Sequence, residues 1–189
     1  MTGRKILEVG VGQSSNPDEA LEEALKGCKN PDLTLVFASS EFNPHEVYSE
    51  IREKVGNSNI IGGTTAGEFS SVVEKPKRGT VAVMTLKSPY LKVGVGVGEG
   101  LSKDPVECGK NAICKSYASL KDNPTASAVI SIAFMKKRSL DLLKMKPFVN
   151  LIIPDGLAGV EEGFIKGIIS ACGCNSCIVG RIHWRRLEM

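Results

Sequence analysis

The sequence has few of the residues on which catalytic and metal sites most often depend. It contains two histidines, His45 and His183, and one tryptophan among 189 residues, and aromatic residues make up 5% of the chain. A Ser-His-Asp or Cys-His set needs an imidazole at hydrogen-bonding distance from the nucleophile, and neither histidine lies in a segment that suggests this. We therefore expect a protein that is not an enzyme and that uses no cofactor.

Long apolar runs are also missing. No segment approaches the roughly 18 residues of a transmembrane helix. The first six residues lead into a strand-like segment without the apolar core of a signal peptide. We expect a cytoplasmic protein with no membrane contact, and its six cysteines are then expected to be reduced thiols.

A strong excess of one charge is absent as well. The chain has 24 basic and 21 acidic residues, a net charge of +3. The last nine residues contain three arginines and one glutamate, so residues 1–180 carry 21 − 20 = +1. A nearly neutral body gives no electrostatic reason to expect nucleic acid as a partner.

Apolar periodicity predicts alternating strands and helices. Strands are expected at residues 6–12, 33–38 and 59–63, and helices at 18–28 and 43–55, where Asn-Pro pairs mark both helix starts. Residues 80–86 and 91–98 are predicted to be two strands of an antiparallel hairpin, joined at a Ser-Pro turn. Further helices are expected at 105–120, 135–145 and 160–172, and further strands at 128–134, 148–153 and 177–180. The fold class is therefore α/β: a β-α-β-α-β start, then a hairpin, with helices covering a mixed sheet.

Glycines alternate with valines in the second strand of the expected hairpin, at Gly94, Gly96 and Gly98. A strand with one face free of side chains indicates that another part of the molecule approaches that face closely.

The densest chemical motif runs from residue 62 to residue 68. It follows an apolar strand, and open α/β sheets bind ligands at the carboxyl ends of their strands. The motif offers close-approach backbone, two hydroxyls and one carboxylate, from Gly62, Gly63, Thr64, Thr65, Gly67 and Glu68. The alternative is a tight turn that needs glycine for positive φ, with the threonines satisfying backbone groups. Asp155 follows another strand-like segment and could meet Glu68 at one sheet edge; a turn cap is its alternative role.

This motif, Ile-Ile-Gly-Gly-Thr-Thr-Ala-Gly-Glu at residues 60–68, resembles the signature of the FIST N-terminal domain. The apolar segment at 33–39, the early strand at 9–15 and the Asn-Leu-Ile-Ile-Pro-Asp-Gly-Leu stretch at 150–157 are similar to the family as well. The resemblance covers about residues 6–180 and places the family domain at 1–180.

The resemblance implies a sensory, ligand-binding domain of cytoplasmic signal transduction, with amino acids as suggested ligands and a signalling protein as a further partner. Backbone N–H groups and hydroxyls at 62–67 would receive the ligand carboxylate, and Glu68 its ammonium group. Two other functions stay open. One is a hydrolase with Thr64 or Thr65 as nucleophile, for which the sequence names no base; the other is a domain fragment that acts only through protein contacts.

The sequence departs from the family pattern at its end. Residues 181–189 form an atypical basic tail where the family continues into a second, C-terminal FIST domain. We therefore expect an architecture that stops early, with a bare sheet edge near Ile178 that favours self-association.

Three cysteines, Cys172, Cys174 and Cys177, lie within six positions, and His183 could complete a tetrahedral metal site. Their spacing is not that of a zinc knuckle. We therefore expect no metal and assign the segment to packing at a helix end, with Gly173 as the C-cap.

Overall fold

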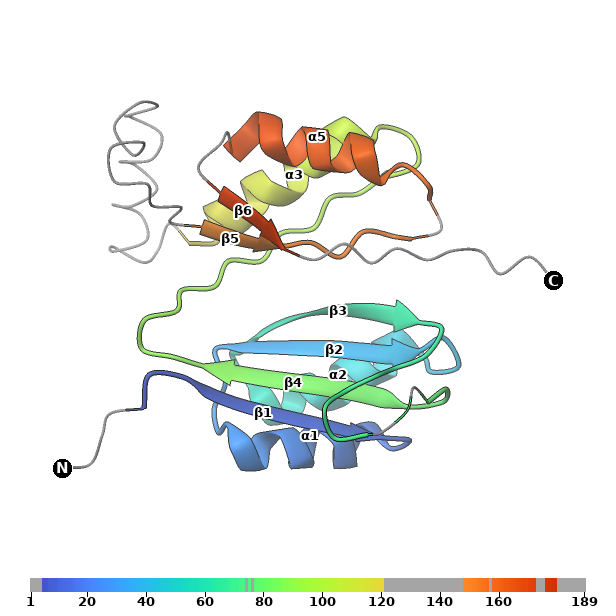
Figure 1. Ribbon diagram of the computed structural model, residues 1–189, viewed down its shortest axis with the longest axis vertical. Coiled ribbons are helices and arrows are strands. Elements are labelled where there is room, and N and C mark those ends of the chain that lie inside the picture. Colours follow the sequence, from blue (N-terminus) through green and yellow to red (C-terminus); the bar gives the residue numbers. More distant parts are fainter. Residues whose placement is uncertain are drawn as a thin grey trace. The chain divides into compact units, whose positions relative to one another are not determined.

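The computed structural model describes residues 5–73, 75, 77–120, 148–156, 158–172 and 176–179. The chain divides into two compact units, residues 1–93 and 94–189 (Figure 1). One family domain can contain two compact units, so the assignment of residues 1–180 to a single domain stays a prediction.

The first unit is built on a four-stranded mixed sheet. Its strands are β1 (Glu8–Ser14), β2 (Leu33–Ser39), β3 (Asn59–Thr65) and β4 (Val81–Lys87), in the order β1-β4-β2-β3. β2 and β3 are parallel, and β4 is antiparallel to both β1 and β2. Strands β1, β2 and β3 therefore all run in one direction, and the expected α/β class with a mixed sheet is confirmed.

Both helices of this unit begin where their local sequence predicts. In α1 (Pro17–Gly27) the Asn16 side chain accepts a hydrogen bond of 2.9 Å from the N–H of Asp18. In α2 (Pro44–Val55) Asn43 accepts one of 3.1 Å from His45. Each cap satisfies an N–H that the helix itself leaves unpaired, and the proline after it supplies a helical φ.

The core of the first unit lies between the sheet and both helices, which therefore cover the same face. It consists of small and branched apolar side chains, namely Ala20, Leu21, Ala24, Val36, Ala38, Val47, Ile51, Val55, Val81 and Val83. Helix α1 lies so close to β1 that a Cβ on Gly10 would overlap the carbonyl oxygen of Ala24. The glycines of β1 thus fix the spacing between sheet and helix.

Residues 80–86 and 91–98 do not form the expected hairpin. β4 is antiparallel as predicted, but its two neighbours are β1 and β2, so both of its edges are already paired. Residues 91–100 contain no strand. Local sequence could not show this, because β1 and β2 lie far from β4 along the chain.

The expected close approach to the glycine face is confirmed. A Cβ on Gly94, Gly96 or Gly98 would overlap backbone carbonyl oxygens of helix α3 (Pro105–Ala118). The alternating glycines let an extended segment lie directly on this helix.

The second unit also packs α3 against α5 (Glu161–Cys172), again through glycines. A Cβ on Gly109 would overlap the carbonyl oxygen of Phe164, and one on Gly167 that of Val106. β5 (Phe148–Leu151) and β6 (Ser176–Val179) form a parallel pair. The elements expected at 128–134 and 135–145, and the tail at 181–189, lie outside the described residues.

Within the described residues, no helix is both long and apolar enough to cross a membrane.

Candidate functional site

Polar side chains gather at one edge of the four-stranded sheet. β1, β2 and β3 end there with Gln13-Ser14, Ser39 and Thr64-Thr65, and antiparallel β4 begins there after Thr80. Because parallel strands share a carboxyl edge, three separate chain segments deliver hydroxyl and amide groups to one place.

Glu68 is the centre of this group. The residue is 2% exposed, and its backbone N–H donates to the Lys77 carbonyl oxygen at 2.9 Å in an isolated antiparallel bridge. The Thr65 hydroxyl donates to Oε1 of Glu68, and the Thr80 hydroxyl donates to Oε2 at 2.9 Å. The carboxylate therefore holds the chain that leaves β3 against the start of β4.

Gln13 extends the network from β1. Its Nε2 donates to the backbone oxygen of Glu68 at 3.2 Å and to the Thr80 hydroxyl oxygen at 3.0 Å. Its Oε1 is buried and has no hydrogen-bond partner among the described residues. We call Gln13, Thr65, Glu68 and Thr80 the Glu68 cluster.

The Glu68 cluster has more acceptors than donors. Both N–H groups of the Gln13 amide and both threonine hydroxyl protons are already donated within it. Gln13 Oε1 and the remaining lone pairs of the Glu68 carboxylate receive no hydrogen bond from within the cluster. No ion pair to Glu68 is present in the part of the chain that the structure describes, so the carboxylate receives its hydrogen bonds from two neutral hydroxyls.

Gly62 and Gly63 lie in β3, as the strand expected at 59–63 predicts. The strand continues through Thr64 and Thr65, and Gly67 and Glu68 follow it. None of the three glycines has a positive φ, so the tight-turn alternative is wrong in that respect.

The two strand glycines differ from each other. A Cβ on Gly62 would overlap the carbonyl oxygen of Val36 on β2, whereas a Cβ on Gly63 would meet nothing within 4 Å. Gly62 is thus required by sheet packing, and Gly63 leaves open space.

Asp155 lies in the second unit, where its backbone oxygen accepts a hydrogen bond of 3.2 Å from Ala158 N–H. This is the turn position that its alternative role predicts. Its meeting with Glu68 stays a prediction.

Sequence reasoning missed Gln13 and Thr80. Gln13 is a long polar residue at the carboxyl end of β1, after four apolar or small residues, and that position was the available signal. Thr80 gave none, because a threonine before a strand is common.

A profile of the FIST N domain matches residues 32–180. The match spans most of the chain and contains the whole 62–68 motif. The chain belongs to the FIST N domain family. FIST domains are sensory domains of signal transduction and are not typically enzymes, so the sensory class expected from the sequence is confirmed at this level.

A search of curated proteins gave no match to this FIST N domain. Among solved structures, a tryptophan-to-tyrosine mutant of FtsZ from M. jannaschii is similar, with 20% identity and a TM-score of 0.32 over 43% of this chain and 27% of that one. CetZ from Methanosaeta thermophila is similar with 15% identity and a TM-score of 0.30 over 73% and 38%. The chain thus spans well under half of these proteins, and scores this low carry no argument about function.

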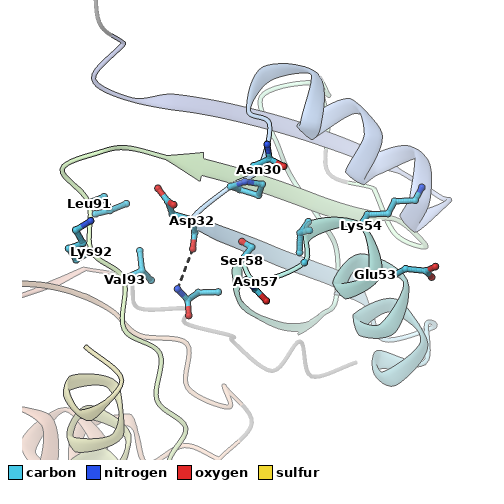
Figure 2. A pocket seen from close by; sticks show the side chains of 13 residues that line it. Asn30, Asp32, Glu53, Lys54, Asn57, Ser58, Leu91, Lys92 and Val93 are labelled. Atoms are coloured by element: carbon cyan, nitrogen blue, oxygen red, sulfur yellow. Dashed lines mark hydrogen bonds between the residues drawn. The ribbon is translucent and has the colours of Figure 1, made fainter. Parts of the chain in front are cut away.

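At the opposite, amino-terminal edge of β2 and β3 the FIST N domain has an open groove of about 560 Å³ (Figure 2). Asp32 and Asn59 lie there, joined by a hydrogen bond of 3.3 Å from Asn59 Nδ2 to the Asp32 backbone oxygen. Asp32 Oδ2 also accepts from the Ser88 N–H at 3.0 Å. About half of the lining residues are exposed, Lys92 among them, and none of the sequence-predicted site residues lies there.

No group of three possible metal ligands occurs among the described residues. Cys172 is buried at the end of α5 and Cys177 lies in β6, whereas Cys174 and His183 fall outside the described part. The assignment of this segment to packing therefore stays a prediction for the three thiols together.

Proposed function

We propose that this FIST N domain senses a small molecule that carries an ammonium group, with a free amino acid as the best fit, and that the Glu68 cluster receives that group. The supporting observation is the buried Glu68 carboxylate with only neutral hydroxyl donors. A buried charge is costly unless a charge of opposite sign accompanies it, and an ammonium group would supply that charge.

The acceptor surplus of the cluster favours the same ligand group. An ammonium group has three N–H donors and no acceptor. Gln13 and Glu68 both contact the Thr80 hydroxyl, and Gln13 Oε1 and the Glu68 carboxylate would offer acceptors to such a donor. A ligand with a hydroxyl or a second carboxylate at this position would match the cluster less well.

The carboxylate of an amino acid would be received nearby. Ala66 and Gly67 follow β3 in a bend, and their N–H groups have no hydrogen-bond partner in the described part of the chain. The Thr64 side chain beside them is exposed. Successive free N–H groups form an anion-accepting concavity, and Gly62 and Gly63 keep the approach free of side chains.

Calorimetric titration with the set of free amino acids tests the proposal. Glu68→Gln keeps the size of the side chain, and the Thr65 hydroxyl can rotate to accept from the new amide, so the fold is retained while the charge is lost. We expect binding to weaken by about tenfold or more, as for a lost charge-assisted hydrogen bond. Glu41→Gln removes the same charge at an exposed position after β2 and should bind like the wild type.

Two outcomes would reject the proposal. If the wild type binds no amino acid, the ligand class is wrong. If it binds one and Glu68→Gln binds it equally well, Glu68 is a structural link between β3 and β4.

One observation favours a second candidate, the threonine hydrolase. Glu68 accepts a hydrogen bond from the Thr65 hydroxyl, which is the contact that a base for this nucleophile would make. An assay with p-nitrophenyl acetate tests it: turnover that is lost in Thr65→Ala and retained in Thr65→Ser would establish the hydrolase, and no turnover in the wild type would remove it.

A further inference from the structure

Among the described strands β3 lies at an edge of its sheet, and its own sequence lacks the residues that usually protect an edge. It pairs with β2 on one side, and no described strand pairs with its other side. Its sequence, Asn-Ile-Ile-Gly-Gly-Thr-Thr, contains no charged residue and no proline. Natural edge strands usually carry such residues because unpaired backbone groups otherwise attract another strand.

The hydrogen bonds at both ends of β3 show which residues face outward. The N–H of Asn59 donates to Asp32, and the carbonyl oxygen of Thr65 accepts from Ser40, both at 3.1 Å. In a parallel ladder alternate residues direct both backbone groups to the same neighbour, so odd-numbered residues of β3 face β2. The N–H and C=O groups of Ile60, Gly62 and Thr64 therefore point outward, and none of them has a hydrogen-bond partner among the described residues.

We propose that this edge pairs with β3 of a second copy of the chain, antiparallel, with Gly62 on the two-fold axis. In this register Gly62 faces the partner's Gly62, and Ile60 faces the partner's Thr64. Each of these hydrogen-bonded pairs exchanges two N–H···O=C bonds. The three pairs therefore satisfy the outward N–H and C=O groups of residues 60, 62 and 64 in both strands. A register shifted by two residues leaves one of the three pairs unmade.

The side chains of the paired strands are compatible in this register. No charge faces another charge, because β3 has none. Ile61 faces the partner's Gly63, the position where a Cβ would meet nothing within 4 Å. The open space beside one glycine thus receives the branched side chain of the other copy.

This interface uses outward backbone groups of β3, whereas the Glu68 cluster uses side chains of residues 13, 65, 68 and 80. The interface and the proposed approach of the ligand both lie beside Gly62, Gly63 and Thr64, so a second copy and a ligand would compete for that space. The interface is distinct from the edge near Ile178 at which self-association is expected from the sequence.

Sedimentation velocity over a range of protein concentrations tests the interface. Thr64→Pro removes an outward N–H, which an edge position tolerates, and Thr64→Val keeps that N–H and the shape of the side chain. We expect a dimer for the wild type and for Thr64→Val. For Thr64→Pro the dissociation constant should rise by about tenfold or more, because two hydrogen bonds are lost per dimer. Circular dichroism and thermal unfolding show whether Thr64→Pro is folded.

A cross-link tests the register without a destabilising change. Ile61→Cys combined with Gly63→Cys places the thiol at 61 of one copy directly opposite the thiol at 63 of the other copy, in a non-hydrogen-bonded antiparallel pair. Mild oxidation should give a disulfide-linked dimer that mass spectrometry assigns to these two positions, while Gly63→Cys alone should give none. A monomeric wild type, a dimer that persists unchanged in folded Thr64→Pro, or a cross-link that does not form would each overturn the proposal.

Discussion

The hydroxyl of Thr80 donates a hydrogen bond of 2.9 Å to Oε2 of Glu68, a residue that is 2% exposed. The same oxygen of Thr80 accepts from Gln13 Nε2 at 3.0 Å. One hydroxyl therefore joins the carboxyl end of β1, the segment after β3 and the start of β4.

Thr80→Val removes this hydroxyl and keeps the shape of the side chain. The free energy of unfolding should fall by about 1–3 kcal/mol, because a buried carboxylate loses a donor and Gln13 loses an acceptor. Thr80→Ser keeps the hydroxyl and should lose less. Urea unfolding of both variants measures the difference, and equal losses would show that the hydrogen bonds contribute nothing.

The adjacent glycines Gly62 and Gly63 of β3 should respond differently to substitution by alanine. Gly62→Ala places a Cβ on the Val36 carbonyl oxygen and should cost about 1–3 kcal/mol of stability. Gly63→Ala places one in open space, so its stability should stay within about 0.5 kcal/mol of the wild type or rise slightly. Thermal unfolding of the pair checks this, and a similar loss in both would contradict the described packing of β2 and β3.

Gly167→Ala sets helix propensity against packing. Propensity alone favours alanine over glycine in a helix by about 1 kcal/mol. The new Cβ would overlap the Val106 backbone oxygen on α3, and backbone cannot move aside as a flexible side chain can. We expect a net loss of stability in chemical unfolding. Lys166→Ala, at the exposed neighbouring position, should change stability by less than about 0.5 kcal/mol, since its ion pair with Glu162 is exposed. A more stable Gly167→Ala would show that α3 and α5 do not pack this closely.

Stability should fall at alkaline pH through two buried thiols. Burial raises the pKa of Cys28 and of Cys108 above the ordinary value of 9.0. A group whose pKa is higher in the folded than in the unfolded state contributes its full stability below the unfolded-state pKa. That contribution is lost as the pH rises through the folded-state pKa. The free energy of unfolding should therefore decrease above about pH 9.

The double variant Cys28→Ala and Cys108→Ala is the control, because lysines and tyrosines titrate in the same range. Its stability should depend less steeply on pH between 8 and about 11 than that of the wild type. At neutral pH a thiol reagent should label Cys114, which is exposed, faster than either buried cysteine. Parallel pH profiles of stability for the two proteins would show that Cys28 and Cys108 do not cause the loss of stability at alkaline pH.

The sequence predicted the helices better than the pairing of the strands. Asn16-Pro17 and Asn43-Pro44 determine helix starts through contacts within two residues, so local sequence is sufficient. The neighbours of β4 are determined by hydrogen bonds to β1 and β2, which lie about 70 and 50 residues earlier. No pattern within residues 80–98 distinguishes such pairing from a hairpin.

The candidate site divides in the same way. Local motif reasoning found Thr65 and Glu68, which lie three residues apart and contact each other. It did not find Gln13, which is 55 residues from Glu68, because only the folding of β1 into the same sheet brings it there.

The sequence by itself determined the α/β class, the two capped helices, the glycine face that another segment must approach, and the family motif, since each depends on residues close together in the chain. The tertiary structure alone decided that β4 lies inside the sheet and that β3 lies at one edge of the described strands. It also decided that Glu68 is buried and accepts hydrogen bonds from two hydroxyls. The physical reason is that burial and strand order depend on which segments, distant in the chain, pack against each other, and the sequence of one segment does not determine its partners.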